Sequence, residues 1–220
     1  MKVLRFAVLL AFALAIPASL SAQFPIQDPA PGTMGYLDYQ GYKHPSHTYD
    51  NFIMNNGYKG ALGGYQFDMF CIDPHNSPMD GNVYITKLAD AGSMYTYQSN
   101  FTNYQKAAWL VSQFGSADPN SHTNGAIQGA IWKLAGAVPS GYTPPAGSID
   151  MWIAKADAFV AANQGWGVNA FAILSDTDHL QDADTYGQEF MVQLPEPGSV
   201  LLLLSGLVGI AGVVVRRRIL

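Results

Sequence analysis

The chain is poor in two residue types that exported domains and nucleic-acid-binding proteins often use. Cys71 is the single cysteine among 220 residues, so no intramolecular disulfide can staple the fold. Residues 23–194 contain no arginine and only six lysines against fifteen acidic residues, a net charge of −9. Phosphate and anionic lipid both require clustered cations, so this composition argues against nucleic acid and anionic membrane surfaces as partners. These 172 residues are still enough to bury a core without disulfides.

Catalytic signatures are equally scarce. The sequence has no Gly-x-Ser-x-Gly elbow, phosphate-binding loop or dinucleotide fingerprint, and its five histidines show no metal-ligand spacing. We therefore predict no metal, no cofactor and no enzymatic activity. An acidic run spans Asp176–Asp184, and the segment Asp182–Gly187 at its end resembles a calcium loop only superficially, because Tyr186 replaces an oxygen ligand and no glutamate stands at the twelfth position. We interpret this run as a solvated loop.

The N-terminus has the three-part layout of a secretory signal peptide. Lys2 and Arg5 precede an uninterrupted apolar run from Phe6 to Ile16, and small residues follow Pro17. The apolar run is too short to span a bilayer. We therefore predict a signal peptide over residues 1–22, cleavage after Ala22, and export.

The C-terminus has a different arrangement. Pro195-Glu196-Pro197 precedes eighteen uncharged residues, 198–215, which as a helix measure about 27 Å against a hydrocarbon core of about 30 Å. Three consecutive arginines follow: Arg216, Arg217 and Arg218. Because such clusters stay on the cytoplasmic side, the pattern predicts a transmembrane helix with the arginine tail inside and the preceding chain outside.

These three parts, in this order over residues 195–220, resemble the PEP-CTERM sorting signal of Gram-negative bacteria. The resemblance implies recognition by an exosortase, a membrane processing enzyme. It also implies anchoring in the inner membrane before processing, then removal of the tail and delivery to the cell surface or extracellular matrix.

Residues 23–194 are predicted to form one α+β domain after a proline-rich linker over 23–33. Apolar alternation or β-rich composition predicts strands over residues 36–42, 65–72, 82–88, 168–174 and 186–194. Helical periodicity predicts three helices over about 101–114, 124–134 and 148–160. Strands, then helices, then strands indicate a mainly antiparallel sheet with an inserted helical segment.

Local signals predict the details of several elements. Asn100 is expected to cap the first helix, Thr123 or Asn124 the second, and Ser148 the third. In the last strand, Phe190, Val192 and Leu194 are expected on one face, with Met191 and Gln193 on the other.

Cys71 alone is compatible with a small buried hydrophobe. It falls on the face of a predicted strand with Met69, and Asp73-Pro74 ends that strand. His75, four residues after Cys71, is a weak candidate to assist thiol deprotonation, since loop histidines are usually solvated.

The sequence around Cys71 also resembles bacterial surface thioester domains over residues 65–135. One motif is Phe70-Cys71-Ile72-Asp73, and the second is Ile127-Gln128-Gly129-Ala130-Ile131, in which Gly129 stands where the family prefers a polar residue. In that family the cysteine sulfur and the glutamine side-chain carbonyl are joined. The resemblance therefore implies an internal thioester between Cys71 and Gln128.

Thioester chemistry requires the sulfur and the carboxamide in contact, and water kept away from the bond. Phe70 and Trp132 are the predicted shielding residues, Trp132 because it lies one helical turn after Gln128. The predicted function is attachment, in which a surface amine or hydroxyl opens the thioester and becomes covalently bound. The alternative is a noncovalent structural protein of an exopolysaccharide or biofilm matrix, in which Cys71 is buried and inert.

Overall fold

A computed structural model of the chain describes part of one compact unit, Asp28–Leu194. The described residues are 29–42, 48–49, 52–53, 57–74, 80–114, 122–136, 138–142, 144, 147–180 and 187–194. The predicted signal peptide (1–22) and the predicted transmembrane helix (198–215) lie outside them. Within the described segments, no helix is long and apolar enough to cross a membrane.

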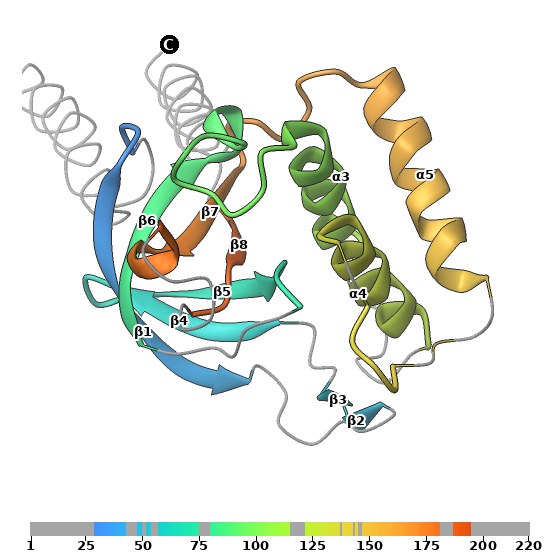
Figure 1. Cartoon of the computed structure of the whole chain (residues 1–220), viewed down its shortest axis with the longest axis horizontal. Coiled ribbons are helices and arrows are strands. Elements are labelled where there is room, and N and C mark those ends of the chain that lie inside the picture. Colours follow the sequence, from blue (N-terminus) through green and yellow to red (C-terminus); the bar gives the residue numbers. More distant parts are fainter. Residues whose placement is uncertain are drawn as a thin grey trace, which may run out of the picture. The chain divides into compact units, whose positions relative to one another are not determined.

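Six strands form a closed antiparallel barrel (Figure 1). Their order around the barrel is β1 (Thr33–Tyr42), β4 (Tyr58–Leu62), β5 (Tyr65–Cys71), β8 (Phe190–Gln193), β7 (Phe171–Asp176) and β6 (Gly81–Lys87), which pairs with β1 again. A separate two-stranded sheet pairs β2 (Thr48–Tyr49) with β3 (Phe52–Ile53). Because the barrel is closed, none of its six strands has an unpaired edge. The sequence pattern did not predict this closure.

Three helices are inserted between β6 and β7: α3 (Phe101–Ser112), α4 (His122–Leu134) and α5 (Ser148–Ala162). Short 3-10 turns, η2 (Leu88–Asp90) and η3 (Thr177–Leu180), follow β6 and β7. Figure 1 shows the three helices gathered on one side of the barrel, opposite β1. The α+β class, the antiparallel sheet and the inserted helical segment are therefore confirmed.

Strand β4 was missed because glycines within it and directly after it interrupt its pattern, and the structure gives three of them a role. A Cβ on Gly60 would lie 2.9 Å from the Met69 sulfur and 3.0 Å from a Leu37 methyl, so a larger residue would require these side chains to shift. Gly63 and Gly64 both have positive φ, 58° and 83°, and form the two-residue turn into β5. The glycines that break the sequence pattern thus allow the strand to form.

The alternation predicted for β8 gives the right faces, with Phe190 and Met191 on opposite sides of the strand, but it did not predict that both faces are buried. Met191 is as deeply buried as Phe190 and Val192, and every residue of β7 is buried as well. Met191 packs in the core beneath the helices, whereas the ring of Phe190 packs against that of Tyr58 on β4, with ring centroids 5.5 Å apart. Helices cover the outer face of these strands and the barrel interior covers the other, so both faces are apolar.

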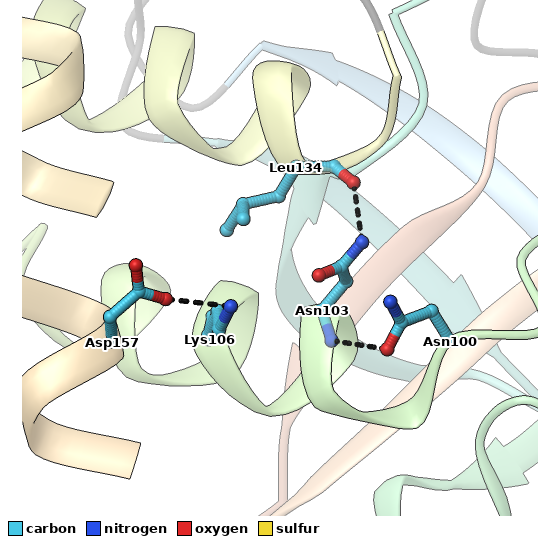
Figure 2. A network of polar contacts seen from close by, with 5 residues as sticks. All are labelled: Asn100, Asn103, Lys106, Leu134 and Asp157. Atoms are coloured by element: carbon cyan, nitrogen blue, oxygen red, sulfur yellow. Dashed lines mark hydrogen bonds and ion pairs between the residues drawn. The ribbon is translucent and has the colours of Figure 1, made fainter. Parts of the chain in front are cut away.

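Of the predicted helix caps, one was right and two were misplaced. Asn100 caps α3, its side-chain oxygen accepting the Asn103 N–H at 3.3 Å (Figure 2). Helix α4 begins at His122, so Thr123 and Asn124 lie inside its first turn, and Asn124 is buried. Ser148 is the first residue of α5, and the cap position is Gly147 with φ 75°.

Polar contacts tie α3 to the two other helices (Figure 2). The Asn103 side-chain amide donates to the Leu134 carbonyl at the end of α4, at 2.9 Å. On the next turn of α3, the Lys106 ammonium lies 2.6 Å from the Asp157 carboxylate of α5. These contacts join α3 to α4 and α5, and the shared apolar core packs the three helices against the barrel.

Candidate functional site around Cys71

Cys71 is the last residue of β5 and lies opposite Phe190 of β8. Its side chain is 1% exposed. The pairing continues for one more residue, since the Ile72 N–H donates to the Glu189 carbonyl at 3.0 Å, and Pro74 lies two residues further on. The cysteine therefore sits where the barrel meets the inserted helices, away from solvent.

Two hydrogen bonds orient the sulfur. The thiol donates to the backbone carbonyl of Asp73 at 3.0 Å, and the indole N–H of Trp132 donates to Sγ at 3.2 Å. Trp132 lies on α4 and is 6% exposed. A cysteine that only filled space would need neither contact, so the sulfur here occupies a polar, oriented environment.

Gln128 lies one turn before Trp132 on α4 and is 7% exposed. Its side-chain nitrogen donates to the backbone carbonyl of Cys71 at 2.9 Å. The structure thus brings together Cys71, Gln128 and Trp132, although 57 and 61 residues separate the cysteine from the other two.

Phe70 takes a different place from Trp132. Its ring stacks on Phe114 after α3, with centroids 5.3 Å apart and an interplanar angle of 16°. It belongs to the apolar core between the barrel and the helices. The Phe70 ring therefore packs in the apolar core, whereas the Trp132 indole contacts the sulfur.

Burial dominates the acidity of the thiol. The pKa of Cys71 is raised from 9.0 to about 12, chiefly by desolvation and to a smaller extent by the charges of Asp73 and Glu189. Hydrogen bonds with the Trp132 indole and the Asp73 backbone lower the pKa and only partly offset the burial. The thiol is therefore protonated at neutral pH.

The indole of Trp132 is held in place by Tyr142. The Tyr142 ring meets it edge-on, with centroids 5.2 Å apart at 73°, and the Tyr142 hydroxyl donates to the Gly125 carbonyl of α4. A Cβ on Gly129 would lie 2.9 Å from the Tyr142 ring and 2.8 Å from an Ile149 methyl. Packing therefore explains the glycine at this motif position, where the family prefers a polar residue.

Gln188 is a residue of the site that the sequence did not reveal. Its side-chain nitrogen donates to the Asp73 carbonyl at 3.0 Å, the same oxygen that accepts the Cys71 thiol. A second carboxamide thus lies close to the sulfur. Gln188 precedes β8 by two residues, and only the barrel register brings it beside β5.

Glu189 is the second residue that the sequence did not reveal. Its carboxylate is fully buried and accepts three hydrogen bonds, from the Ser175 hydroxyl at 2.6 Å, the Tyr97 N–H at 3.0 Å and the Tyr104 hydroxyl at 2.8 Å. Desolvation raises its pKa from 4.5 to about 7, against the lowering effect of these donors.

Burial and the charge of Glu189 raise the pKa values of Tyr97 and Tyr104, so both hydroxyls stay protonated donors. The sequence offered one signal for this site: Glu189 is an acidic residue directly before the apolar run of β8, and a buried charge needs hydrogen-bonding partners.

Other candidates from the sequence receive little further support from the described residues. The Asp176 carboxylate accepts the backbone N–H groups of Asp178 at 2.9 Å and Gly187 at 2.7 Å, so it organises its own loop. Residues 181–186 of the acidic run lie outside the described segments, as does His75. Across the described segments, no group of three or more potential metal-ligating side chains occurs.

The sorting residues also lie outside the described segments: Pro195, Glu196, Pro197, Arg216, Arg217 and Arg218. The described chain ends at Leu194, whose N–H donates to the Ala170 carbonyl at 2.8 Å. The barrel is therefore complete where the predicted tail begins.

Comparison with known proteins identifies this tail. The PEP-CTERM protein-sorting motif matches residues 193–218. No curated protein and no solved structure matches the chain. The chain therefore carries a PEP-CTERM sorting motif at its C-terminus and is an exported protein that an exosortase sorts to the cell surface, typically in Gram-negative bacteria.

Proposed function

We propose that the sorted domain attaches covalently to matrix or to another surface through an internal thioester between Cys71 Sγ and the side-chain carbonyl carbon of Gln128. The observation that carries the proposal is the convergence of Cys71, Gln128 and Trp132 in one buried site. The two thioester-like motifs are distant in sequence, and nothing in the barrel itself requires them to meet.

Formation of the bond follows from the groups present. The thiol sulfur attacks the Gln128 carbonyl carbon, the S–C bond forms, the C–N bond breaks, and the thiol proton leaves with the nitrogen as ammonia. Because burial holds the pKa of Cys71 at about 12, we expect proton transfer to accompany attack rather than a free thiolate to precede it. The departing nitrogen is anchored on the Cys71 carbonyl, 2.9 Å away, next to the attacking residue.

Burial also suits the survival of such a bond. Cys71, Gln128 and Trp132 are each less than a tenth exposed, so bulk water has little access to the carbonyl carbon. A thioester kept dry reacts mainly with a nucleophile that enters the site.

The incoming group would be an amine or a hydroxyl on the target, giving an amide or an ester. The net charge of −9 over residues 23–194 favours encounter with amine-bearing, cationic surfaces over anionic polymers. Each molecule would react once and remain attached, so we do not propose an enzyme.

Intact mass spectrometry of the exported domain tests the thioester. The wild-type mass should fall short of the sequence mass by one ammonia, and methylamine should convert the deficit into a gain at Gln128. Cys71→Ala and Gln128→Ala should each restore the full mass. Gln188→Ala is the matched control, because it removes the neighbouring carboxamide and should keep the deficit.

A wild-type domain of full mass, whose thiol is alkylated stoichiometrically on unfolding, would overturn the thioester. That result would favour a second candidate function, a noncovalent structural protein of an exopolysaccharide matrix. The supporting observation is the same burial: a thiol with a pKa of about 12 and 1% exposure is chemically inert if it is not acylated.

We further propose that the exosortase removes the tail and releases the domain from the inner membrane. The mature protein should lack Arg216, Arg217 and Arg218 in a strain with an exosortase and retain them in a strain without one. A retained tail in both strains would contradict this step.

A further inference from the structure

The geometry points to Trp132 as a catalytic residue of the Cys71–Gln128 thioester, with its indole N–H stabilising the charge that develops on the sulfur when the C–S bond breaks. This inference rests on the proposed thioester. It assigns Trp132 a chemical role in addition to the shielding expected from its place on α4.

The position of the indole nitrogen carries the argument. A ring that only excluded water could present any edge to the sulfur, but Trp132 directs its single N–H donor at Sγ from 3.2 Å. The thiol proton points elsewhere, to the Asp73 carbonyl at 3.0 Å. The indole therefore donates to a sulfur lone pair, where negative charge accumulates when sulfur departs.

The surroundings make this donor important. Burial disfavours charge on the sulfur, and the neighbouring carboxylates of Asp73 and Glu189 add to the penalty. Two hydrogen bonds oppose these effects, and that of Trp132 is the larger. Without it, the sulfur would be a poorer leaving group.

The packing around Trp132 preorganises the donor. Tyr142 holds the indole edge-on, its hydroxyl is fixed to the Gly125 carbonyl, and Gly129 leaves the space that the Tyr142 ring fills. A donor fixed before the reaction needs no reorganisation while charge develops, which is the condition for electrostatic catalysis.

The reaction that the indole assists is aminolysis. An incoming amine attacks the Gln128 carbonyl carbon, a C–N bond forms, and the C–S bond breaks with its electron pair passing to sulfur. A proton from the amine then reaches the sulfur and regenerates the thiol. The indole N–H remains on nitrogen throughout and contributes only the hydrogen bond.

Trp132→Phe tests this role, because it removes the N–H and keeps most of the ring. We expect the variant to retain the ammonia deficit and to react with methylamine about 10- to 100-fold more slowly than wild type, the range for a lost hydrogen bond to a charged group. Trp132→His restores an N–H on a smaller ring and should recover part of the rate.

Trp109→Phe is the matched control. Trp109 lies on α3, where its ring stacks on that of Phe159 with centroids 5.3 Å apart and packs near the ring of Trp152. This substitution removes an equivalent N–H from the helical layer and should leave the methylamine rate unchanged.

The outcomes separate the roles of Trp132. An unchanged methylamine rate in a Trp132→Phe domain that carries the deficit would overturn the inference, as would faster spontaneous hydrolysis alone, which indicates a shield. The rate is measured per molecule carrying the deficit, so partial misfolding does not alter the comparison. A wild-type domain without the deficit would refute the thioester and this role together, whereas an unaffected variant refutes only the role.

Discussion

Cys71 ends β5, Glu189 directly precedes the neighbouring strand β8, and both side chains are buried. Their surroundings differ in how strongly they disfavour the charged form of each group. Glu189 has three donors directed at its carboxylate and a pKa of about 7, whereas Cys71 is a protonated thiol with a pKa of about 12. The backbone links them, since the Ile72 N–H donates to the Glu189 carbonyl at 3.0 Å. Both groups are buried, but Glu189 is surrounded by hydrogen-bond donors, whereas Cys71 lies beside the carboxamide with which we propose that it reacts.

Cys71 and Glu189 differ in the groups that surround them rather than in how deeply their side chains are buried. Donors around Glu189 come from β7, α3 and the segment between η2 and α3, so its carboxylate joins the barrel to the helical layer. The Gln128 carboxamide donates to the backbone carbonyl of Cys71, and it is the group that the thiol would attack in the proposed thioester. The following experiments test whether this division between structure and chemistry holds.

The largest effect is expected from opening the thioester. A cross-link between residues 71 and 128 closes a loop of 57 residues, and the chain-entropy treatment of disulfides assigns such a loop about 4 kcal/mol of stability. Treatment with methylamine should therefore lower the free energy of unfolding by about that amount, measured by urea titration. The stability of Cys71→Ala should not change with methylamine. An equal loss of stability in both proteins would show that methylamine does not act through Cys71.

The next effect concerns Glu189 and pH. Its pKa is higher in the folded state than in the unfolded chain, so its contribution to stability is fully present below about pH 4.5 and is lost as the pH rises through about 7. The free energy of unfolding should fall by about 3 kcal/mol between these values, on the scale of 1.36 kcal/mol per pKa unit.

Glu189→Gln is the isosteric control for this pH dependence. It cannot ionise, so its stability should lack the loss between pH 4.5 and 7. Urea titrations of both proteins across this range measure the difference. A wild-type stability that rises with pH in this window would show that Glu189 is held ionised, and the contrast with Cys71 would then be sharper.

A smaller effect is expected from Gly129→Ala. The added methyl would meet the Tyr142 ring and Ile149 at less than 3.0 Å, and overpacking of this kind costs about 1–3 kcal/mol. Displacement of Tyr142 should also disturb Trp132 and slow aminolysis. Gly81→Ala, which adds a methyl in open space, is the control and should change thermal stability little.

The smallest effect is expected at the helix surface. Lys106 and Asp157 form an ion pair at 2.6 Å, but the aspartate side chain is 50% exposed, so solvent screening limits the pair to less than about 1 kcal/mol. Asp157→Asn should lower the melting temperature slightly, and added salt should remove the difference. The more exposed pair of Lys133 and Asp150 is the control, with a still smaller effect expected for Asp150→Asn. A large loss at Asp157 would mean that surface charge, and not buried polar groups, holds the helices to the barrel.

Much of the fold was predictable because local patterns agree with the tertiary structure. Three periodic segments became α3, α4 and α5, and the alternation ending at Cys71 became β5. The failures have a common cause. Gly60 interrupts the pattern of β4, and the burial of Met191 on the second face of β8 was not predicted, since closure and helix cover decide which positions are interior.

The site was predictable only in part. Motif resemblance singled out Cys71, Gln128 and Trp132, and helical spacing put the last two on one face of α4. Gln188 and Glu189 carry no comparable signal, because their contacts with the Asp73 carbonyl, Tyr97 and Tyr104 join segments 85 or more residues apart.

The sequence by itself determined where this protein is sent and that no disulfide can form within it. Sorting signals are read as linear segments, and a count of one cysteine needs no fold. Only the tertiary structure decided the environment of that cysteine. Barrel closure sets β8 beside β5, and the packing of α4 supplies the carboxamide and the indole, so the acidity and orientation of the thiol arise from groups that chain order keeps far apart.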